Sequence, residues 1–176
     1  MGAPSGPDGP GSLGGLLPDA AIRIGVNAAD WREAVRAAGR GLIASGATTE
    51  AYTDEMIATV EALGPYIVIA PGVALAHSRP SPSVHHTGFS LVTLDPPVAF
   101  GHRTNDPVHL VIGLAAPNDE GHVNALATLA EFLSDEQRRS ALLAAEDTQT
   151  VRSLFAAWED GTPREEPASK DAVEPA

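Results

Sequence analysis

The sequence predicts a single-domain α/β layered fold, in which a mixed, mostly parallel β-sheet is flanked by helices. Helical periodicity dominates the first part of the chain, short β-branched apolar runs follow, and helical patterns return toward the end. Helices that precede, separate and follow strands are typical of a sheet covered by helices. With 176 residues, the chain has the length of one domain. A chain of this size buries roughly 70% of its unfolded surface, so its core needs no disulfide or metal.

The two ends of the chain carry few residues that could enter a core. Residues 1–19 are rich in Gly, Pro and Ser, and residues 161–176 combine Pro with acidic side chains. Segments of such composition bury too little apolar surface to offset the entropy lost on ordering. We therefore predict a flexible N-terminal extension over residues 1–19, a folded domain over residues 20–160, and a disordered acidic tail over residues 161–176.

Two helices are predicted at the start of the folded domain. Asp30 is suited to cap a helix over residues 31–45, and Gly64-Pro65 ends a second helix over residues 49–63. The apolar residues that recur at helical spacing in these segments are expected to lie in the core: Trp31, Val35, Ala38, Leu42, Tyr52, Met56, Ile57 and Val60.

Four short apolar runs are predicted to be strands: residues 66–70, 72–76, 87–94 and 108–115. Continuous apolar runs of this length indicate strands buried on both faces. Pro96-Pro97 is expected to break the third strand, with residues 98–100 as a continuation or an edge piece. Three further helices are predicted over residues 118–133, 135–145 and 148–158. Asn118 and the acids after it suit the first turn of a helix.

Composition and charge exclude several classes of function. The sequence contains no cysteine, which excludes disulfides, thiolate metal sites and cysteine nucleophiles within it. A formal charge of −12 argues against nucleic acid, which favours basic surfaces. The apolar runs are shorter than the ~20 residues that span a bilayer, and residues 1–15 lack the pattern of a secretory signal. We expect a cytoplasmic protein without direct membrane insertion, whose acidic surface either steers a basic partner or only keeps it in solution.

His77 is the main candidate for chemistry. It follows a buried apolar run at the mouth of a loop, which would fix its backbone and leave the imidazole accessible. Ser78 and Arg79 follow directly, and a hydroxyl and a guanidinium are suitable donors to an oxyanion. His122 lies near the start of a predicted helix. In α/β sheets, functional groups gather where strands end and helices begin, so both histidines are well placed.

The segments around these histidines resemble the type-2 EIIA domains of the bacterial phosphoenolpyruvate-dependent sugar phosphotransferase system (PTS). That family has an apolar run ending in Pro-His, which stands here as Gly-Val-Ala-Leu-Ala-His over residues 72–77. Its second histidine is matched by Gly-His-Val-Asn-Ala-Leu over residues 121–126. The Gly-Pro-Tyr-Ile-Val-Ile-Ala-Pro-Gly lead-in over residues 64–72 and the Ser-Arg-Pro exit over residues 78–80 resemble the ascorbate-specific branch. The resemblance covers about residues 30–158.

This resemblance implies a phosphocarrier that needs neither a cofactor nor a metal. His77 would accept a phosphoryl group from phospho-HPr and pass it to a cysteine of an EIIB partner, with the membrane component EIIC involved only indirectly. His122 would donate an N–H to the phosphoryl oxygens or to the His77 ring, and Arg79 and Ser78 are further phosphate-binding candidates. The family's proline before the active histidine is Ala76 here, which leaves the entry to His77 less constrained.

Other interpretations stay open from the sequence alone. The chain could be a regulatory phosphoprotein of the same fold that reports its phosphorylation state, or a binding module without activity. A histidine after an apolar strand is often structural, His122 could only cap its helix, and a loop arginine is commonly solvated. The remaining histidines lack the spacing of a helical ligand motif. We also expect an apolar ring around His77 for its partners, formed by Val73, Leu75 and Phe89.

Overall fold

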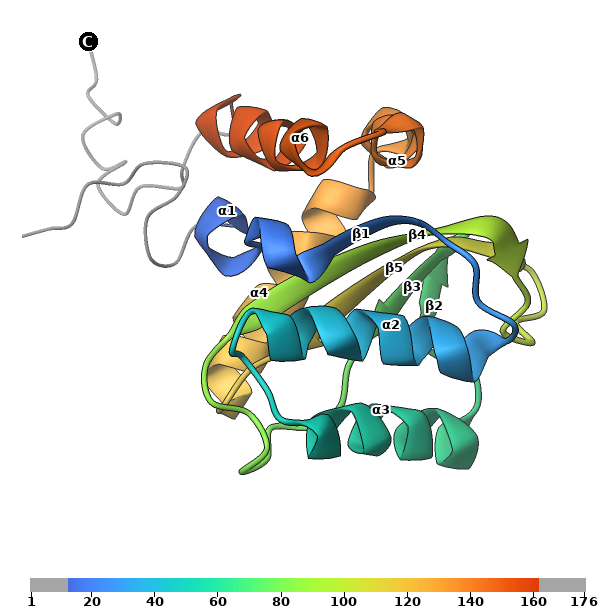
Figure 1. The fold of residues 1–176 in the computed structure, drawn as a ribbon, viewed down its shortest axis with the longest axis vertical. Helices are drawn as coiled ribbons and strands as arrows, with labels where there is room; N and C mark the ends of the chain where they lie inside the picture. The colour runs from blue at the N-terminus through green and yellow to red at the C-terminus, as the bar shows by residue number, and fades with distance from the viewer. Residues whose placement is uncertain (1–12, 162–176) are drawn as a thin grey trace, which may run out of the picture.

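The computed structural model describes residues 13–161 (Figure 1). Most of the predicted extension and the whole predicted acidic tail except residue 161 lie outside the described residues. Within the described part, helices cover both faces of one β-sheet (Figure 1). The predicted α/β layered fold with a mixed sheet is therefore confirmed.

The sheet has five strands in the order β1-β4-β5-β3-β2. β1 pairs with β4 and β3 pairs with β5 in parallel, whereas the β4–β5 and β2–β3 pairs are antiparallel. Parallel and antiparallel pairings are thus equal in number, although the sequence predicts a mostly parallel sheet. The bounds of the strands are β1 Ile22–Val26, β2 Val68–Ala70, β3 Val73–Ala76, β4 Gly88–Val98 and β5 Val108–Ala115.

The helices form two layers, and each layer buries its own apolar core against the sheet (Figure 1). The helices α2 and α3 cover one face, and α1, α4, α5 and α6 lie on the other. The caps predicted from the sequence are present, because Asp30 accepts a hydrogen bond from the Glu33 amide at 2.9 Å. The bounds of the helices are α1 Leu13–Leu16, α2 Trp31–Ala44, α3 Glu50–Leu63, α4 Asp119–Leu133, α5 Glu136–Ala144 and α6 Thr148–Gly161, with a 3₁₀ turn at Asp19–Ala21.

The packed region begins before residue 20, where the sequence prediction placed its start. Leu17 is 2% exposed, and Leu16 packs against the same core as α4 and α6. The prediction of a flexible segment up to residue 19 is therefore wrong for this part. The burial of Leu17 and the partial burial of Leu16 anchor this segment, because fully burying a leucine side chain contributes about 1.5–3 kcal/mol.

Two features of the strands also differ from the prediction. β1 was not predicted, although Ile22, Ile24 and Val26 alternate with less apolar residues as in an edge strand. β4 continues through Pro96-Pro97 to its end at Val98, rather than breaking there. The pairing with β5 shifts register over this stretch, and prolines are tolerated at such irregularities because no ladder N–H is required there.

The topology determines which functional segments meet. β3 and β5 are parallel neighbours, with Ala76 opposite Gly113, so their carboxyl ends reach the same edge of the sheet. His77 directly follows β3, and the connection to α4 directly follows β5. His77 and His122, which lie 45 positions apart in the sequence, are thereby brought to one edge of the sheet. This is the edge where α/β sheets place their functional groups.

Candidate functional site

The imidazole ring of His77 is held by a backbone carbonyl group. Its Nδ1 lies 2.7 Å from the carbonyl oxygen of Leu75. A carbonyl oxygen can only accept a hydrogen bond, so Nδ1 carries the hydrogen and Nε2 keeps its lone pair. The resemblance allows His122 to donate an N–H to the His77 ring, but the hydrogen-bond partner of His77 Nδ1 is a backbone carbonyl of β3. In a neutral His77, Nε2 is therefore the nitrogen whose lone pair is available to a reaction partner.

Two further rings flank His77. The ring centroid of His122 lies 5.5 Å from that of His77, and the ring of Tyr66 meets His77 edge-on at 5.6 Å. Burial lowers the pKa of His77 below its usual value, the hydrogen bond to Leu75 opposes this shift, and the charge of His122 adds to it. At neutral pH the His77 ring is therefore uncharged, as a nucleophile must be.

His122 is positioned by the first turn of α4. The side chain of Asn118 accepts a hydrogen bond from the Gly121 amide at 2.7 Å, and the Asn118 carbonyl accepts one from the His122 amide at 3.0 Å. Burial lowers the pKa of His122, while the nearby Asp119 raises it. The acids Asp119 and Glu120 in this turn offset the positive end of the helix dipole.

Ser78 is anchored away from the His77 ring. It is buried, and its Oγ lies 3.2 Å from Oγ1 of Thr59 on α3. Because Thr59 donates its own hydrogen to the Glu55 carbonyl at 2.8 Å, Ser78 is the donor of the pair. A contact between the Ser78 hydroxyl and a phosphate would require breaking this hydrogen bond. We therefore expect the backbone of Ser78, rather than its hydroxyl, to contribute to the site.

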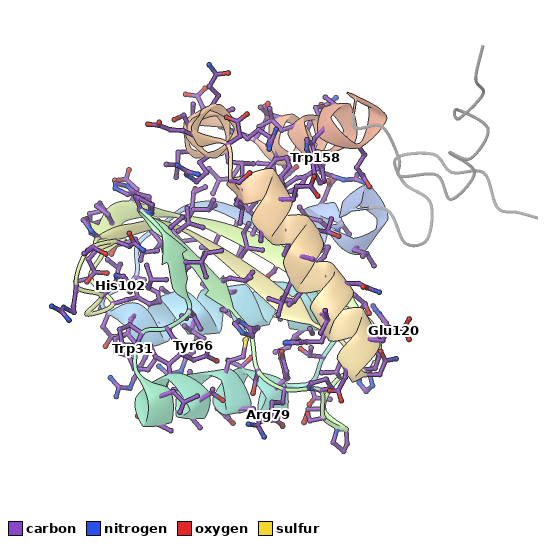
Figure 2. All side chains as sticks on the ribbon, turned by 180° about the vertical axis from the view of Figure 1, so that it is seen from behind. Trp31, Tyr66, Arg79, His102, Glu120 and Trp158 are labelled. Carbon is purple, nitrogen blue, oxygen red and sulfur yellow. The ribbon has the colours of Figure 1, made fainter. Side chains whose placement is uncertain are left out.

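Arg79 is exposed on the loop after His77. Figure 2 shows it beside α3, on the side of the molecule where Glu120 marks the start of α4. Burial raises the pKa of Tyr66 and the charge of Arg79 lowers it, which places the guanidinium within electrostatic range of the ring that flanks His77. An exposed cation at this position can approach a phosphoryl group on His77.

Two tyrosines belong to the site although the sequence analysis did not assign them to it. Tyr66 flanks His77, and Tyr52, predicted only as a core residue, accepts a hydrogen bond from the Ser78 amide at 2.9 Å. A tyrosine at a buried helix position was the available signal, since a buried phenol normally has a hydrogen-bond partner. Which backbone group it would reach depends on the tertiary fold, so the sequence could not supply it.

The apolar surroundings of His77 differ from the expected ring. Val73, Leu75 and Phe89 are at most 2% exposed, and so that prediction is wrong. The exposed apolar side chains near the site are instead Tyr66, Ile69 and Val123, at 41%, 41% and 60% exposure. We call these three residues the apolar patch. A groove of about 520 Å³ adjoins it, lined by residues from β2, β3 and α4 that include Ile69 and Leu126.

Among the described residues, no group of three or more His, Asp or Glu side chains is arranged to hold a metal ion. His102, for example, takes part in a turn. Its Nδ1 accepts hydrogen bonds from the amides of Thr104 and Asn105 at 3.2 and 3.0 Å. Within residues 13–161, no helix is both long and apolar enough to cross a membrane.

The chain is similar to known proteins over most of its length. The family model "Phosphoenolpyruvate-dependent sugar phosphotransferase system, EIIA 2" matches residues 16–158. The ascorbate-specific PTS system EIIA component of Escherichia coli (strain K12) is 37% identical over 141 residues, which cover 80% of this chain and 92% of that protein.

Solved structures of Escherichia coli proteins are also similar. The mannitol-specific cryptic phosphotransferase enzyme IIA CmtB is 30% identical with a TM-score of 0.74, covering 82% of this chain and 98% of that one. The mannitol enzyme IIA, solved in complex with phosphorylated enzyme IIB, is 29% identical with a TM-score of 0.71, covering 81% of this chain and 99% of that one. The chain therefore belongs to the type-2 EIIA family of the phosphoenolpyruvate-dependent sugar phosphotransferase system.

Proposed function

We propose that this chain is a cytoplasmic phosphocarrier in which His77 accepts a phosphoryl group from phospho-HPr and passes it to a cysteine of an EIIB protein. The observation that carries the proposal is the hydrogen bond from His77 Nδ1 to the Leu75 carbonyl at 2.7 Å. It leaves the Nε2 lone pair free in a neutral ring. Family membership supports the direction of transfer, and a IIA–IIB complex is known for a relative.

Each transfer breaks one P–N bond. The first transfer forms a new P–N bond on His77, and the second forms a P–S bond on the EIIB cysteine. The Nε2 lone pair of His77 attacks phosphorus, and the P–N bond of the donor phosphohistidine breaks with its electron pair returning to the donor ring. The His77 ring becomes positive as the new bond forms, and the Leu75 carbonyl stabilises that charge through Nδ1–H. In the second transfer a cysteine thiolate of EIIB attacks phosphorus, and the P–Nε2 electron pair returns to His77.

The remaining polar groups would stabilise the charge on the transferred group. Phosphoryl transfer leaves little covalent chemistry for the protein, so position and electrostatics dominate. We assign His122 to donate an N–H to the phosphoryl oxygens, because its ring lies 5.5 Å from that of His77. Arg79 is assigned as the mobile cation, and Ser78 contributes mainly through its backbone. The transported substrate is proposed to be ascorbate or a related carbohydrate, after the relative that is 37% identical.

The proposal is tested by incubating the protein with phosphoenolpyruvate, Enzyme I and HPr. The expected product carries one phosphoryl group that is labile to acid, seen by intact mass before and after acid treatment. His77→Ala is expected to lose this modification completely, because it removes the nucleophile.

His85→Ala is the matched control for this experiment. His85 is exposed, and we give its side chain no part in the site, so the variant should be phosphorylated as the unmodified protein is. Retention of the acid-labile group in His77→Ala, or its loss in His85→Ala, would contradict the assignment of the phosphoacceptor.

A further inference from the structure

The hydroxyl group of Tyr52 lies between the two segments that carry the histidines. Tyr52, on α3, is fully buried. Its hydroxyl oxygen accepts a hydrogen bond from the Ser78 amide at 2.9 Å, and the hydroxyl donates to the Leu114 carbonyl at 2.8 Å. Ser78 directly follows His77, and Leu114 lies at the end of the strand that leads to α4 and His122. We call these contacts the Tyr52 bridge.

The hydroxyl has a role that core packing alone does not explain. Phenylalanine would fill the same space, and burying a hydroxyl is costly unless its hydrogen bonds are made. Burial raises the pKa of Tyr52 well above its usual value, so the phenol stays protonated and can donate and accept at once. The Ser78 carbonyl also lies 3.2 Å from it. The phenol therefore contacts both backbone polar groups of the residue after His77.

A second contact from α3 reinforces this position. The Ser78 hydroxyl donates to Thr59 Oγ1, which lies 3.2 Å away and is itself bonded to the Glu55 carbonyl. One helix thus holds Ser78 by its amide, its carbonyl and its side chain. Ala76 stands where the family that this sequence resembles has proline, so the backbone on the other side of His77 has no ring to constrain its φ angle.

We propose that Tyr52 is a positioning residue for phosphoryl transfer, an inference that rests on the proposed function of His77. The Tyr52 bridge fixes the backbone after His77 relative to the strand that leads to His122. It thereby preserves the bond between His77 Nδ1 and the Leu75 carbonyl and keeps the two imidazoles paired. Without the bridge, the His77 ring would sample orientations in which Nε2 no longer faces the donor.

The test is Tyr52→Phe, which removes only the hydroxyl. We expect kcat for transfer from phospho-HPr to fall about 10-fold or more, because small displacements of reacting groups are costly, while KM stays unchanged because the protein surface is unaltered. A second readout is the ¹⁵N spectrum of the His77 ring. In the unmodified protein it should show the Nδ1–H tautomer alone, and in Tyr52→Phe it should show a mixture of tautomers.

Thr53→Val is the matched control. Thr53 is the next residue on α3, and it is also buried, but its hydroxyl has no hydrogen-bond partner among the described residues. This variant should keep kcat and the tautomer of His77. Loss of stability alone in Tyr52→Phe, with wild-type kcat and an unchanged His77 spectrum, would overturn the inference.

Two further readouts keep the inference testable. If Tyr52→Phe does not fold, amide exchange of the unmodified protein replaces it: the Ser78 amide should be protected, and exchange at the rate of an open loop would count against the bridge. If His77→Ala still accepts phosphate, the proposed function fails, whereas the tautomer of His77 in Tyr52→Phe still tests the bridge by itself.

Discussion

His77 combines three local interactions that each affect its reactivity. The Leu75 carbonyl fixes the tautomer, burial favours the uncharged ring, and His122 opposes the addition of a proton. A nucleophilic histidine must be both neutral and correctly oriented, and here separate groups meet the two requirements. The accessible nitrogen results from this division, because the backbone takes Nδ1 and leaves Nε2 for the partner.

These interactions predict how His77 depends on pH. Its pKa lies below the usual 6.5, so phosphorylation should stay fast as pH falls through 6.5 and decline only at lower pH. His122→Gln removes a charge that lowers the pKa of His77, so it should shift the midpoint upward. NMR titration of the His77 ring and the pH–rate profile of phosphorylation measure both effects. A wild-type midpoint at or above 6.5 would contradict the prediction.

The same pKa shifts determine the direction in which folding stability changes with pH. The pKa values of His77 and His122 are both lower in the folded state than the usual 6.5. Between the folded values and 6.5 the unfolded chain therefore binds more protons, and stability rises with pH across that window. The contribution of both residues is fully present above 6.5 and is lost as pH falls through their folded pKa values.

At the scale of elements, the N-cap of α4 shapes the turn that carries His122. Its N-cap Asn118 bonds the Gly121 amide, one residue before His122, so the cap sets the course of the turn that carries this imidazole. α5 has an equivalent cap, because Asp135 accepts a hydrogen bond from the Gln137 amide at 2.7 Å. Both caps accept a hydrogen bond from an amide of the first turn, although Asp135 also lies 3.4 Å from Arg138. Only the first cap lies beside His122.

This pair of caps permits a matched comparison. Asn118→Ala and Asp135→Ala should each cost about 1 kcal/mol of stability, the usual effect of losing an N-cap side chain, as measured by urea unfolding. Only Asn118→Ala should also slow phosphoryl transfer from phospho-HPr, because it loosens the turn that holds His122. Equal transfer rates in the two folded variants would show that the α4 cap does not position the imidazole.

Elements that depend on local signals were predicted well. Asp30 and Asn118 cap helices in the structure, as predicted from their residue types and positions. β1 was missed because it is short and contains Gly25, and it forms by pairing with the distant β4. The expected apolar ring was wrong because β3 is buried on both faces, and a continuous apolar run does not reveal which side chains reach solvent.

At the scale of the whole molecule, the site exists because of strand order. The sequence resemblance identified His77 and His122 as a pair, and the parallel pairing of β3 with β5 accounts for their proximity. The contacts of Tyr66 and Tyr52 could not be read from the sequence, because they join α3 and the segment before β2 to residues that are distant along the chain. The sequence thus predicted which two histidines lie together, but not the backbone and tyrosine groups that contact His77 and Ser78.

The surface around His77 indicates how partners approach. The ring of Tyr66 contacts the His77 ring, and Val123 directly follows His122, whose ring also lies beside His77. In the proposed transfer a donor must bring phosphorus to His77 Nε2, and we expect these neighbouring side chains to lie within its footprint. Exposed apolar side chains in such a position are typical of the core of a protein interface.

The apolar patch therefore predicts an effect on binding rather than on chemistry. Val123→Asp and Val123→Lys should each raise KM for phospho-HPr about 5- to 10-fold, a loss of about 1–1.4 kcal/mol, with little change in kcat. Because aspartate and lysine carry opposite charges, the two variants together distinguish the loss of apolar contact from electrostatic repulsion between the protein and phospho-HPr. Leu143→Asp is the control, because Leu143 is 40% exposed on α5, at the other end of α4 from His122 (Figure 2). If KM rises only in Val123→Asp, charge rather than apolar contact governs docking; if it rises equally in Leu143→Asp, the patch is not the docking surface.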